Sequence, residues 1–319
     1  MNVLALDIGG TKVACGTYSK DGRKLRHQVA ALEKRTGTEV GDLIAGLIRD
    51  GISDIKKKNE VLSAVGISVP GIYYPDSGTV WAPNIPGWEA FPLLKEISRL
   101  KELQTDHIKI DSDRACYILG ETWQGCARGC TNAIFMAVGT GIGAGILADG
   151  KILRGQNDIA GAIGWLTMDR FYRPAYKSYG HFEYYASGEG LIRLTHEMIE
   201  ENPGYTGILK TGPLSELSTP DLFKAFDQGD EIAISVLERA VSLWGMAAAN
   251  LVSLFNPEVI IFGGGVFGPA VRFIDRIRKE MELWAQPVSV KKVRLESSQL
   301  GSEAGMAGAA FLALQSLKK

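Results

Sequence analysis

The sequence predicts an α/β protein with two similar halves, each a mixed sheet flanked by helices. A buried strand runs into a glycine-rich turn twice, at residues 3–12 and 133–143, and each copy is followed by a second apolar strand and an Asp-Gly turn. Beyond each copy, segments with helical spacing alternate with short apolar runs. The chain of 319 residues is long enough for two domains. We therefore expect a duplicated βββαβα order, with the ligand in the cleft between the halves.

In the first half, apolar runs bounded by turn signals predict strands, and apolar residues at helical spacing predict helices. The Pro70-Gly71 pair ends one of these strands, and the loop that follows, 73–88, is rich in proline and glycine. The expected strands are 3–8, 12–18, 25–32, 61–69, a short one at 79–82, and 107–110, and the expected helices are 38–58, 91–103 and 114–126.

The second half repeats this order and ends in a helix with a small face that permits close packing. A long helix is expected at 230–255, with Asp230 as its N-cap. The other expected strands are 133–138, 143–147, 258–262 and 288–295, the other helices are 187–200, a short one opening at 219–221, 269–284 and 303–317, and 151–180 is expected to be irregular.

The domain boundaries are expected where the two halves meet. A smaller domain would hold residues 1–113 plus 303–319, and a larger one residues 114–302. No linker rich in serine or proline separates them, so close docking is expected.

Composition limits the partners and the compartment. The net charge of −1 offers no electrostatic case for nucleic acid or an anionic membrane. Met1 leads directly into a strand without the basic region of a signal peptide, which favours a cytoplasmic location and free thiols. Cys126 and Cys130 have no matching Cys/His pair nearby, which disfavours a metal site. The apolar stretch 241–255 is too short for a membrane span and is expected to be a buried helix.

The first glycine turn is a candidate phosphate site. It lacks the Gly-Lys-[Ser/Thr] ending of a P-loop, but its glycines allow a tight turn whose amides face an anion. Asp7, at a strand end, could orient a hydrated Mg²⁺. From these residues alone, the alternative is that Asp7 caps a turn and Lys12 is solvated. The candidate cofactor-binding residues are Asp7, Gly9, Gly10, Thr11 and Lys12.

The second glycine turn nominally fits the dinucleotide pattern G-x-G-x-x-[G/A]. That pattern requires a helix to follow, whereas residues 145–150 predict a hairpin, so the dinucleotide interpretation fails. A turn between two strands still exposes amides that suit a β- or γ-phosphate. The candidate residues are Gly139, Thr140, Gly141 and Gly143.

A third glycine run, Gly263, Gly264 and Gly265, follows a strand and opens a helix. A dinucleotide site would need this unit at the start of a nucleotide-binding half, but it lies near the end of the chain. It is interpreted as one wall of a nucleotide site, against adenosine or ribose. The alternative is a close helix–strand crossing.

Asp111-Ser112-Asp113 is the best-placed carboxylate cluster, after a strand and before a helix. Phosphoryl transfer needs phosphate clamps, Mg²⁺ and a carboxylate that takes the hydroxyl proton. Asp113 is the candidate, and its alternative role is an N-cap only. Asn84 lies between Trp81 and Trp88, an arrangement that suits a sugar or, alternatively, a loop packed between tryptophans.

Taken together, these motifs resemble the ROK family (repressors, open reading frames and kinases) over essentially the whole chain. The first two glycine turns resemble the family's two phosphate segments, and the third resembles its adenosine segment. Asp113, followed by Leu119-Gly-Glu121, resembles the catalytic-Asp helix. Ser68-Val-Pro-Gly71 and Pro83-Asn-Ile-Pro-Gly-Trp88 resemble the Pro-Gly turn and the loop whose Asn contacts the sugar.

The resemblance implies two actin-like ATPase (ribonuclease H-like) halves, with ATP and Mg²⁺ as cofactors and Asp113 as general base. It also implies a homodimer. The substrate-binding residues that it implies are Gly71, Asn84, Ser112, Asp113, Ala162, Trp165 and Glu183.

The chain departs from the family pattern on the sugar side. Ser112 stands where the family has Asn, and Ala162 and Trp165 stand where it has a Glu and a His that bind sugar hydroxyls. The three cysteines of the family's zinc site are missing around Pro174–His181, so no zinc is expected. Glu183 is kept. Each lost hydrogen bond to a sugar hydroxyl is worth about 0.5–1.5 kcal/mol, so plain glucose should bind weakly.

The function that these motifs favour is ATP-dependent phosphorylation of a hexose or hexose-derived sugar, similar to glucokinase. Trp165 would stack on a sugar face or fill space beside a less hydroxylated or substituted sugar. The alternative is a non-catalytic sugar sensor or regulator, and a donor such as polyphosphate is also open. The chain starts at the catalytic strand, without the DNA-binding segment of ROK repressors.

Overall fold

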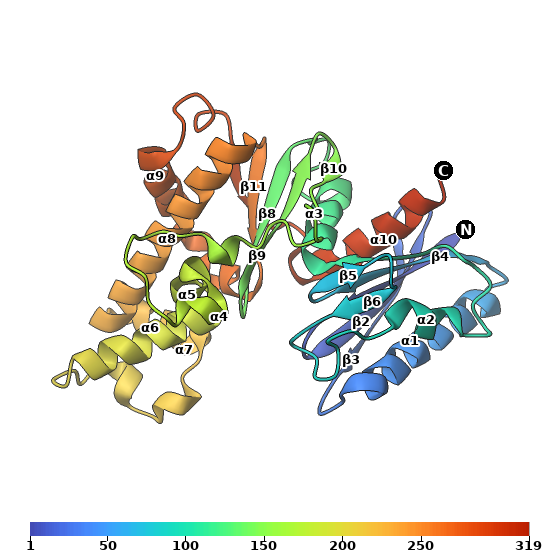
Figure 1. Ribbon diagram of the computed structural model, residues 1–319, viewed down its shortest axis with the longest axis horizontal. Coiled ribbons are helices and arrows are strands. Elements are labelled where there is room, and N and C mark those ends of the chain that lie inside the picture. Colours follow the sequence, from blue (N-terminus) through green and yellow to red (C-terminus); the bar gives the residue numbers. More distant parts are fainter. Residues whose placement is uncertain (319) are drawn as a thin grey trace. The chain divides into compact units, whose positions relative to one another are not determined.

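The computed structural model describes residues 1–318, which form two compact units, each with its own sheet and core (Figure 1). Unit 1 comprises Met1–Gly129, Arg154–Ala160 and the chain from Gln299 onward. Unit 2 comprises Cys130–Leu153 and Gly161–Ser298. The predicted α/β class is therefore confirmed in both halves of the chain.

Unit 1 contains a five-stranded sheet in the order β3-β2-β1-β4-β7. The β3-β2-β1 pairs are antiparallel, and β1-β4 and β4-β7 are parallel. Its strands are β1 (Asn2–Ile8), β2 (Lys12–Ser19), β3 (Lys24–Ala31), β4 (Leu62–Val69) and β7 (Ile108–Ser112), with a separate hairpin of β5 (Ile72–Tyr74) and β6 (Thr79–Trp81). Its helices are α1 (Gly37–Lys57), α2 (Leu93–Ser98), α3 (Asp113–Gln124), a 3₁₀ turn η6 (Gly301–Glu303) and α10 (Ala304–Ser316).

The alternation of side chains along β1 explains why helices cover both faces of this sheet. Leu4 and Leu6 belong to a buried cluster with residues of α1 and α2, whereas Val3 and Ala5 belong to a cluster with residues of α3 and α10. Figure 1 shows α1 and α2 on one side of the sheet and α10 on the other.

The small residues of α10 allow its backbone to lie directly on its neighbours, as the sequence predicts. A Cβ on Gly308 would lie 1.8 Å from the carbonyl oxygen of Cys116 in α3. A Cβ on Gly66 in β4 would lie 1.8 Å from the carbonyl oxygen of Ala309. Side chains at these glycines would therefore overlap backbone atoms, and glycine is required for the packing.

Unit 2 contains a five-stranded sheet in the order β10-β9-β8-β11-β12. Its strands are β8 (Ala133–Val138), β9 (Ile142–Ala148), β10 (Lys151–Ile152), β11 (Val259–Gly263) and β12 (Arg294–Ser297). Its helices are α4 (Tyr176–Tyr179), α5 (His181–Ala186), α6 (Gly188–Glu201), α7 (Thr219–Asp227), α8 (Glu231–Phe255) and α9 (Ile274–Trp284). Its 3₁₀ turns are η1 (Ile163–Trp165), η2 (Ile208–Lys210), η3 (Leu214–Glu216), η4 (Gly265–Phe267) and η5 (Pro269–Phe273).

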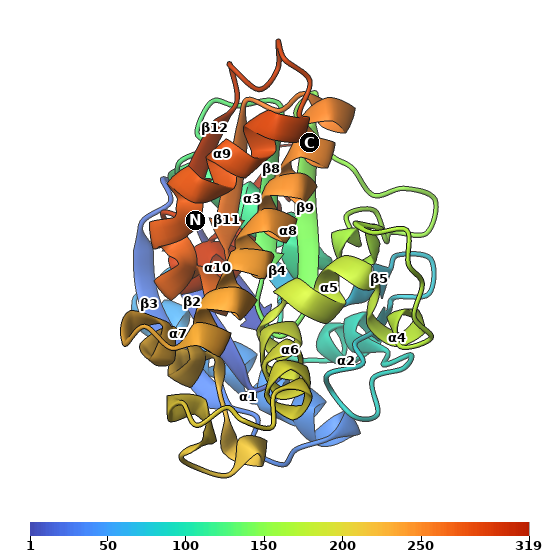
Figure 2. The ribbon, with the colours of Figure 1, turned by 90° about the vertical axis from the view of Figure 1, so that its left-hand side faces the viewer.

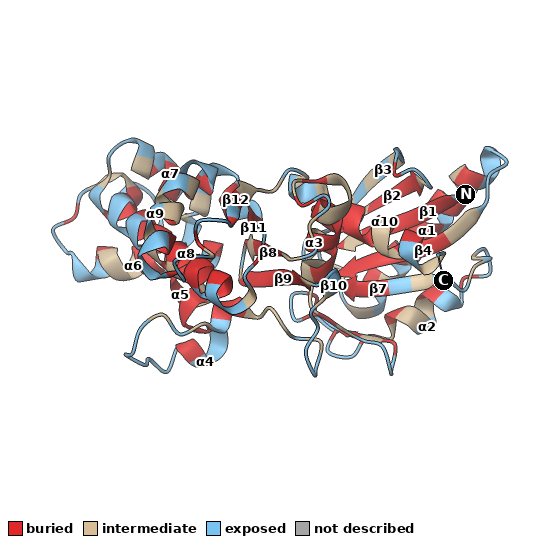
Figure 3. Ribbon diagram, turned by 90° about the horizontal axis from the view of Figure 1, so that it is seen from above, coloured by how far each residue is buried: buried red, intermediate tan, exposed pale blue. Residues whose placement is uncertain are grey.

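The second sheet repeats the topology of the first, which confirms the predicted duplication. The β10-β9-β8 pairs are antiparallel, and β8-β11 and β11-β12 are parallel. The helices α8 and α9 lie over the same face of this sheet (Figure 2). Buried residues run along the strands and along α8 (Figure 3).

The long helix α8 has the predicted bounds and cap. The carboxylate of Asp230 accepts hydrogen bonds from the backbone N–H groups of Ile232 and Ala233, at 3.1 and 3.0 Å. The helix is long and apolar enough to cross a membrane by length and composition alone, but 67% of its most apolar window is buried inside the structure.

Two predicted elements differ from the structure. The strand expected at 288–295 is wrong, because only Arg294–Ser297 pairs with β11. The side-chain oxygen of Gln286 accepts hydrogen bonds from the N–H groups of Val288 and Ser289, both at 2.8 Å, and these local bonds hold a turn in place of a strand.

The helix expected at 91–103 ends after Ser98, because the chain continues in i to i+3 turns. The N–H of Leu100 bonds the carbonyl of Ile97, and that of Leu103 bonds Leu100. Both leucines still face the core, so the hydrophobic spacing continues after the helix has stopped. The short helix α5 was not predicted.

The compact units end at other residues than the expected domains. Helix α3 belongs to unit 1 because it packs against α10, and Arg154–Ala160 is a second segment of unit 1. The expected boundaries, 1–113 plus 303–319 and 114–302, place both segments in the larger domain.

Candidate functional site

The first glycine turn joins β1 to β2 in unit 1. The N–H of Gly9 donates to the carbonyl of Lys12 at 2.9 Å, which closes the turn, and Gly10, Thr11 and Lys12 are exposed. A Cβ on Gly10 would lie 3.2 Å from the Cβ of Asn84. The structure therefore brings the predicted sugar residue Asn84, itself exposed, beside the predicted phosphate turn.

Asp7 lies near the end of β1 and accepts a hydrogen bond from the neighbouring strand. The hydroxyl of Ser68 in β4 donates to its carboxylate at 2.6 Å. Burial raises the pKa of Asp7 to about 6, the hydrogen bond from Ser68 opposes this shift, and the negative charge of Asp113 adds to it. The charge of Asp113 therefore acts on Asp7.

Asp7 fits the chemistry of a Mg²⁺ site. Magnesium prefers carboxylate and water oxygens, and one or two carboxylates usually suffice for a cation that arrives with a nucleotide. A cation beside Asp7 would offset the cost of burying its charge, which the raised pKa reveals.

Asp113 is the first residue of α3, and Ser112 is its N-cap. The hydroxyl of Ser112 accepts a hydrogen bond from the N–H of Ala115 at 3.3 Å. The capping role is thus filled by the neighbour, and the alternative that Asp113 serves only as an N-cap is wrong. Its carboxylate accepts the N–H of Arg114 at 2.7 Å. Burial raises the pKa of Asp113, and Arg114 and a hydrogen bond from Tyr117 oppose the shift.

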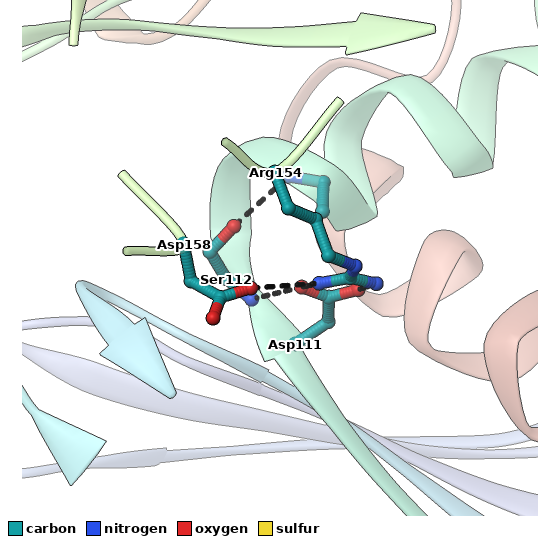
Figure 4. A network of polar contacts seen from close by, with 5 residues as sticks. Asp111, Ser112, Arg154 and Asp158 are labelled. Carbon is teal, nitrogen blue, oxygen red and sulfur yellow. Dashed lines mark hydrogen bonds and ion pairs between the residues drawn. The ribbon is translucent and has the colours of Figure 1, made fainter. Parts of the chain in front are cut away.

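Asp111, two residues earlier, is part of a separate ion pair (Figure 4). Arg154 donates to both carboxylate oxygens of Asp111, at 2.7 and 2.5 Å. The Asp111 side chain is 4% exposed. One of its oxygens also accepts the N–H of Ser112 at 2.8 Å. The pair therefore fastens the segment 154–160 to the end of β7, immediately before Asp113.

The Pro-Gly loop divides into packing and exposed residues. Gly71 lies against β6, where a Cβ would be 2.1 Å from the carbonyl oxygen of Trp81. Trp88 is fully buried, donates its indole N–H to the carbonyl of Gly37 at 3.0 Å and stacks on Phe91. Trp88 is therefore a packing residue, and of the aromatic pair only Trp81 has an exposed ring.

The second glycine turn lies in unit 2, between β8 and β9. The N–H of Gly139 donates to the carbonyl of Gly141 at 2.9 Å, and the carbonyl of Gly139 accepts the N–H of Gly188 at 2.7 Å. Gly188 begins α6, so the N-terminus of this helix adjoins the turn. Thr140 is exposed, and Gly143 pairs with Ala137 inside the sheet.

The third glycine run adjoins the second turn. Gly264 has a φ of +89°, and a Cβ there would lie 2.4 Å from the carbonyl oxygen of Val138 at the end of β8. Gly263 packs on the ring of Phe135, and Gly265 begins η4. The sequence therefore needs glycine here to bring two strand ends together, and both glycine segments gather at one edge of the sheet in unit 2.

Glu183, predicted to bind the sugar, also bonds the second glycine turn. Its carboxylate accepts the backbone N–H of Ile142 at 2.6 Å. Gly164 in η1 packs against it, with a Cβ position 2.9 Å from the Cβ of Glu183. Burial raises the pKa of Glu183, and the bond from Ile142 opposes the shift. Ala162 immediately precedes η1, and Trp165 ends it with 54% of its surface exposed.

An aromatic cluster occupies the segment where the family's zinc cysteines are missing. His181 is buried and contacts the rings of Tyr176 and Tyr185, whose hydroxyls are 2.9 Å apart. Burial lowers the pKa of His181. Within residues 1–318, no three His, Cys, Asp or Glu side chains gather as metal ligands.

The candidate residues thus form one group in each unit. Unit 1 holds the first glycine turn, Asn84, Gly71, Ser112 and Asp113, and unit 2 holds the other glycine segments, Ala162, Trp165 and Glu183. The expected cleft between the halves stays a prediction. Sequence reasoning missed Tyr117 and Arg154. Tyr117 lies four residues after Asp113 on a predicted helix, which is a usable signal, whereas nothing local to Arg154 marks its partner.

Two copies of one α/β unit, each with glycine turns at its strand ends, define an actin-like kinase fold. The ROK family model matches residues 3–316, and the chain belongs to this family. It is 30% identical to a glucokinase of Halalkalibacterium halodurans, over 98% of this chain and 94% of that protein. It is 28% identical to an N-acetyl-D-glucosamine kinase of Escherichia coli, over 97% of this chain and 98% of that protein.

A solved relative has the same fold over its full length. The ROK family glucokinase from Streptomyces griseus, in complex with glucose and AMPPNP, is 28% identical and superposes with a TM-score of 0.78, covering 99% of this chain and 100% of that one. The predicted family and actin-like fold are therefore confirmed.

Proposed function

We propose that this protein transfers the γ-phosphoryl group of ATP to a hydroxyl of a hexose or hexose-derived sugar, with Asp113 as general base. The enzyme class, a sugar kinase, is confirmed by relatives named glucokinase and N-acetyl-D-glucosamine kinase. The observation that carries the assignment of the base is the β7–α3 junction. Ser112 caps the helix there, so the Asp113 carboxylate is not needed as the cap.

In the proposed reaction, the carboxylate of Asp113 accepts the proton of the sugar hydroxyl, and the oxygen of that hydroxyl bonds to the γ-phosphorus. The bond between the γ-phosphorus and the bridging oxygen breaks, and ADP leaves with the electron pair. A general base works best with a pKa near the operating pH. Burial shifts the pKa of Asp113 in that direction.

The glycine segments would hold the nucleotide. The exposed turn at Gly9–Lys12 and the turn at Gly139–Gly143 present backbone amides to phosphates, and Gly263–Gly265 would face adenosine or ribose. Asp7 would hold Mg²⁺ through water. When bound, Mg²⁺ neutralises charge on the phosphates of ATP.

The acceptor is proposed to be a substituted or less hydroxylated sugar rather than plain glucose. Ala162 has no polar side chain to bond a hydroxyl, and Trp165 offers an exposed ring instead. Glu183 has one oxygen engaged by Ile142, and its other oxygen would accept a sugar hydroxyl. An N-acyl sugar would place an apolar group where Trp165 can cover it.

The wider assembly belongs to the same proposal. We expect a homodimer, by resemblance to the family, and a cytoplasmic location. The net charge of −1 supports a protein without nucleic-acid or membrane partners.

The test is ADP release with ATP and Mg²⁺ across a panel of hexoses, amino sugars and N-acyl sugars. We expect sugar-dependent turnover, greatest with a substituted sugar. Asp113→Asn should lower kcat by at least about a hundredfold and leave the KM for the sugar nearly unchanged. Sugar binding without turnover, whether the donor is ATP or polyphosphate, would favour the regulator alternative, and turnover with polyphosphate alone would replace the donor.

A further inference from the structure

Arg193 on α6 contacts two tyrosine rings at once. Its guanidinium carbon lies 4.3 Å from the centre of the Tyr179 ring and 4.6 Å from the centre of the Tyr184 ring. Tyr179 is the last residue of α4, and Tyr184 lies in α5. A guanidinium over the face of an aromatic ring is attracted by the ring quadrupole. Arg193 therefore joins three helices of unit 2, and no step of the proposed reaction uses it.

The same guanidinium also completes the end of α5. The last carbonyls of a helix have no partner within the helix. In α5, Arg193 donates to the carbonyl of Tyr184 at 3.0 Å, and the indole of Trp244 donates to the carbonyl of Ala186 at 3.0 Å. Because a guanidinium is planar, it can donate in its plane while its faces meet rings, which a lysine ammonium cannot do.

The corner between α4 and α5 lies directly on η1. Gly180 separates the two helices with a φ of +76°, and a Cβ there would lie 2.4 Å from the carbonyl oxygen of Gly164 and 2.5 Å from the Cα of Trp165. Gly164 in turn packs against Glu183 in α5. A shift of this corner therefore moves the backbone of η1, which carries Trp165 and follows Ala162.

We propose that Arg193 is a positioning residue for the acceptor sugar, which fixes the α4–α5 corner against which the backbone of Trp165 lies. This inference rests on the proposed function, in which Trp165 covers the acceptor. A segment that is already held in its bound shape loses little conformational entropy when the sugar binds. Loss of Arg193 would thus weaken sugar binding rather than slow the transfer step, for which Asp113 is the proposed base.

A second residue of α6 limits the effect to one side of the corner. The hydroxyl of Tyr184 donates to the carboxylate of Glu197 at 2.6 Å, one helical turn after Arg193. Tyr184 is buried and keeps this bond when Arg193 is lost, whereas the Tyr179 side chain is 37% exposed and has less support. Loss of Arg193 should therefore loosen the end of α4 and Gly180 while α5 stays folded.

The test measures steady-state kinetics of Arg193→Met with the best sugar of the panel. Methionine keeps an unbranched chain but has neither the charge nor the planar group. We expect the KM for the sugar to rise about tenfold, while kcat and the KM for ATP stay within about twofold of wild type. Arg193→Lys keeps a cation near the rings and should recover part of the sugar KM.

Hydrogen exchange gives a readout that does not depend on turnover. In sugar-free Arg193→Met, peptides covering 162–167 and 176–180 should exchange about fivefold faster or more than in wild type, while peptides of α8 stay unchanged. Tyr179→Leu removes a partly exposed ring from the same guanidinium. It should give the same pattern to a smaller degree, and it decides the question where Arg193→Met does not fold.

Arg276→Met is the matched control. The guanidinium carbon of Arg276 lies 5.5 Å from the centre of the Phe273 ring, and the side chain pairs with Glu238, also in unit 2. We expect a wild-type sugar KM and wild-type exchange at 162–167.

An unchanged sugar KM in Arg193→Met overturns the inference. A rise in the KM for both substrates, or a fall in kcat alone, also overturns it, because either result would indicate a general loosening of the protein. Absence of turnover in the wild type would instead overturn the proposed function, and the exchange at 162–167 would still decide whether Arg193 holds η1.

Discussion

Asp7 is a residue at which folding and the proposed chemistry make opposite demands. Its carboxyl has a pKa of about 6, above the ordinary value of 3.8, chiefly because it is buried. Between pH 4 and 6 the folded protein keeps a proton that the unfolded chain has released, so unfolding becomes easier as the pH rises through this window. Above pH 6 the fold carries an ionised carboxylate whose burial is compensated only in part by Ser68.

Asp7→Asn should therefore stabilise the protein while it strongly lowers turnover. Asparagine keeps the oxygen that accepts from Ser68 but removes the charge. We expect the free energy of unfolding at pH 7.5, without nucleotide, to rise by about 1–3 kcal/mol. Because the proposed magnesium contact is lost, kcat should fall by about a hundredfold or more.

Thermal melts across pH provide the check. The gain in stability of Asp7→Asn over wild type should be present above pH 6. It should vanish below pH 4, where the wild-type carboxyl is protonated in both the folded and the unfolded state. A variant less stable than wild type at pH 7.5, or a gain that persists unchanged at pH 4, would contradict the account of a buried unpaired charge.

At the scale of elements, helix α10 holds unit 1 together through backbone contact. Its residues lie against β4 and α3, and the contact at Gly308 leaves no room for a methyl group. The backbones of neighbouring elements approach each other closely along a row of small residues. Each glycine in this row is needed because a side chain would not fit, and not because the backbone turns there.

Gly308→Ala should destabilise the protein severely. The new methyl group would overlap the carbonyl oxygen of Cys116, 1.8 Å away, so either α3 or α10 has to shift. We expect a loss of about 2–4 kcal/mol in a thermal or urea melt. Gly46→Ala is the control, because this glycine lies within α1 and has open space at its Cβ position. It should instead gain about 0.5–1 kcal/mol. Equal effects of the two substitutions would refute the packing argument.

How far the sequence predicts an element depends on whether the deciding interactions are local. The helix α8 was predicted with its N-cap because a capping aspartate and a long apolar face are adjacent in sequence. The strand at 288–295 failed because its β-branched residues look like a strand, while one side chain, Gln286, diverts the backbone into a turn. Glycine turns were found because they are contiguous.

At the scale of the whole molecule, the sequence identifies residues whose chemistry suits the site. It is less informative about the packing around those residues. Asp113 and Asn84 were identified by type and motif, and their proposed roles stay predictions. The resemblance to a known family suggested Trp88 as part of a sugar loop, but its ring is buried against Phe91. Tertiary packing decides which side of a loop is exposed, and a single sequence does not contain that information.

The role of Arg154 follows from the path of the chain and is visible only in the folded molecule. The chain enters unit 1 from unit 2 at Arg154 and returns after Ala160, and the ion pair with Asp111 fastens this segment beside the proposed base. Arg154→Met leaves the buried Asp111 carboxylate unpaired. In this variant we expect the hydrogen-exchange rate of peptides covering 154–160 and 108–113 to rise about tenfold or more, and kcat to fall about tenfold. The double variant Arg154→Met/Asp111→Asn should recover part of the protection from exchange, because the unpaired charge is removed. Arg173→Met, which removes the exposed pair with Glu197 in unit 2, is the matched control and should change neither measurement. Unchanged hydrogen exchange at both segments in Arg154→Met would show that packing alone holds residues 154–160 in place.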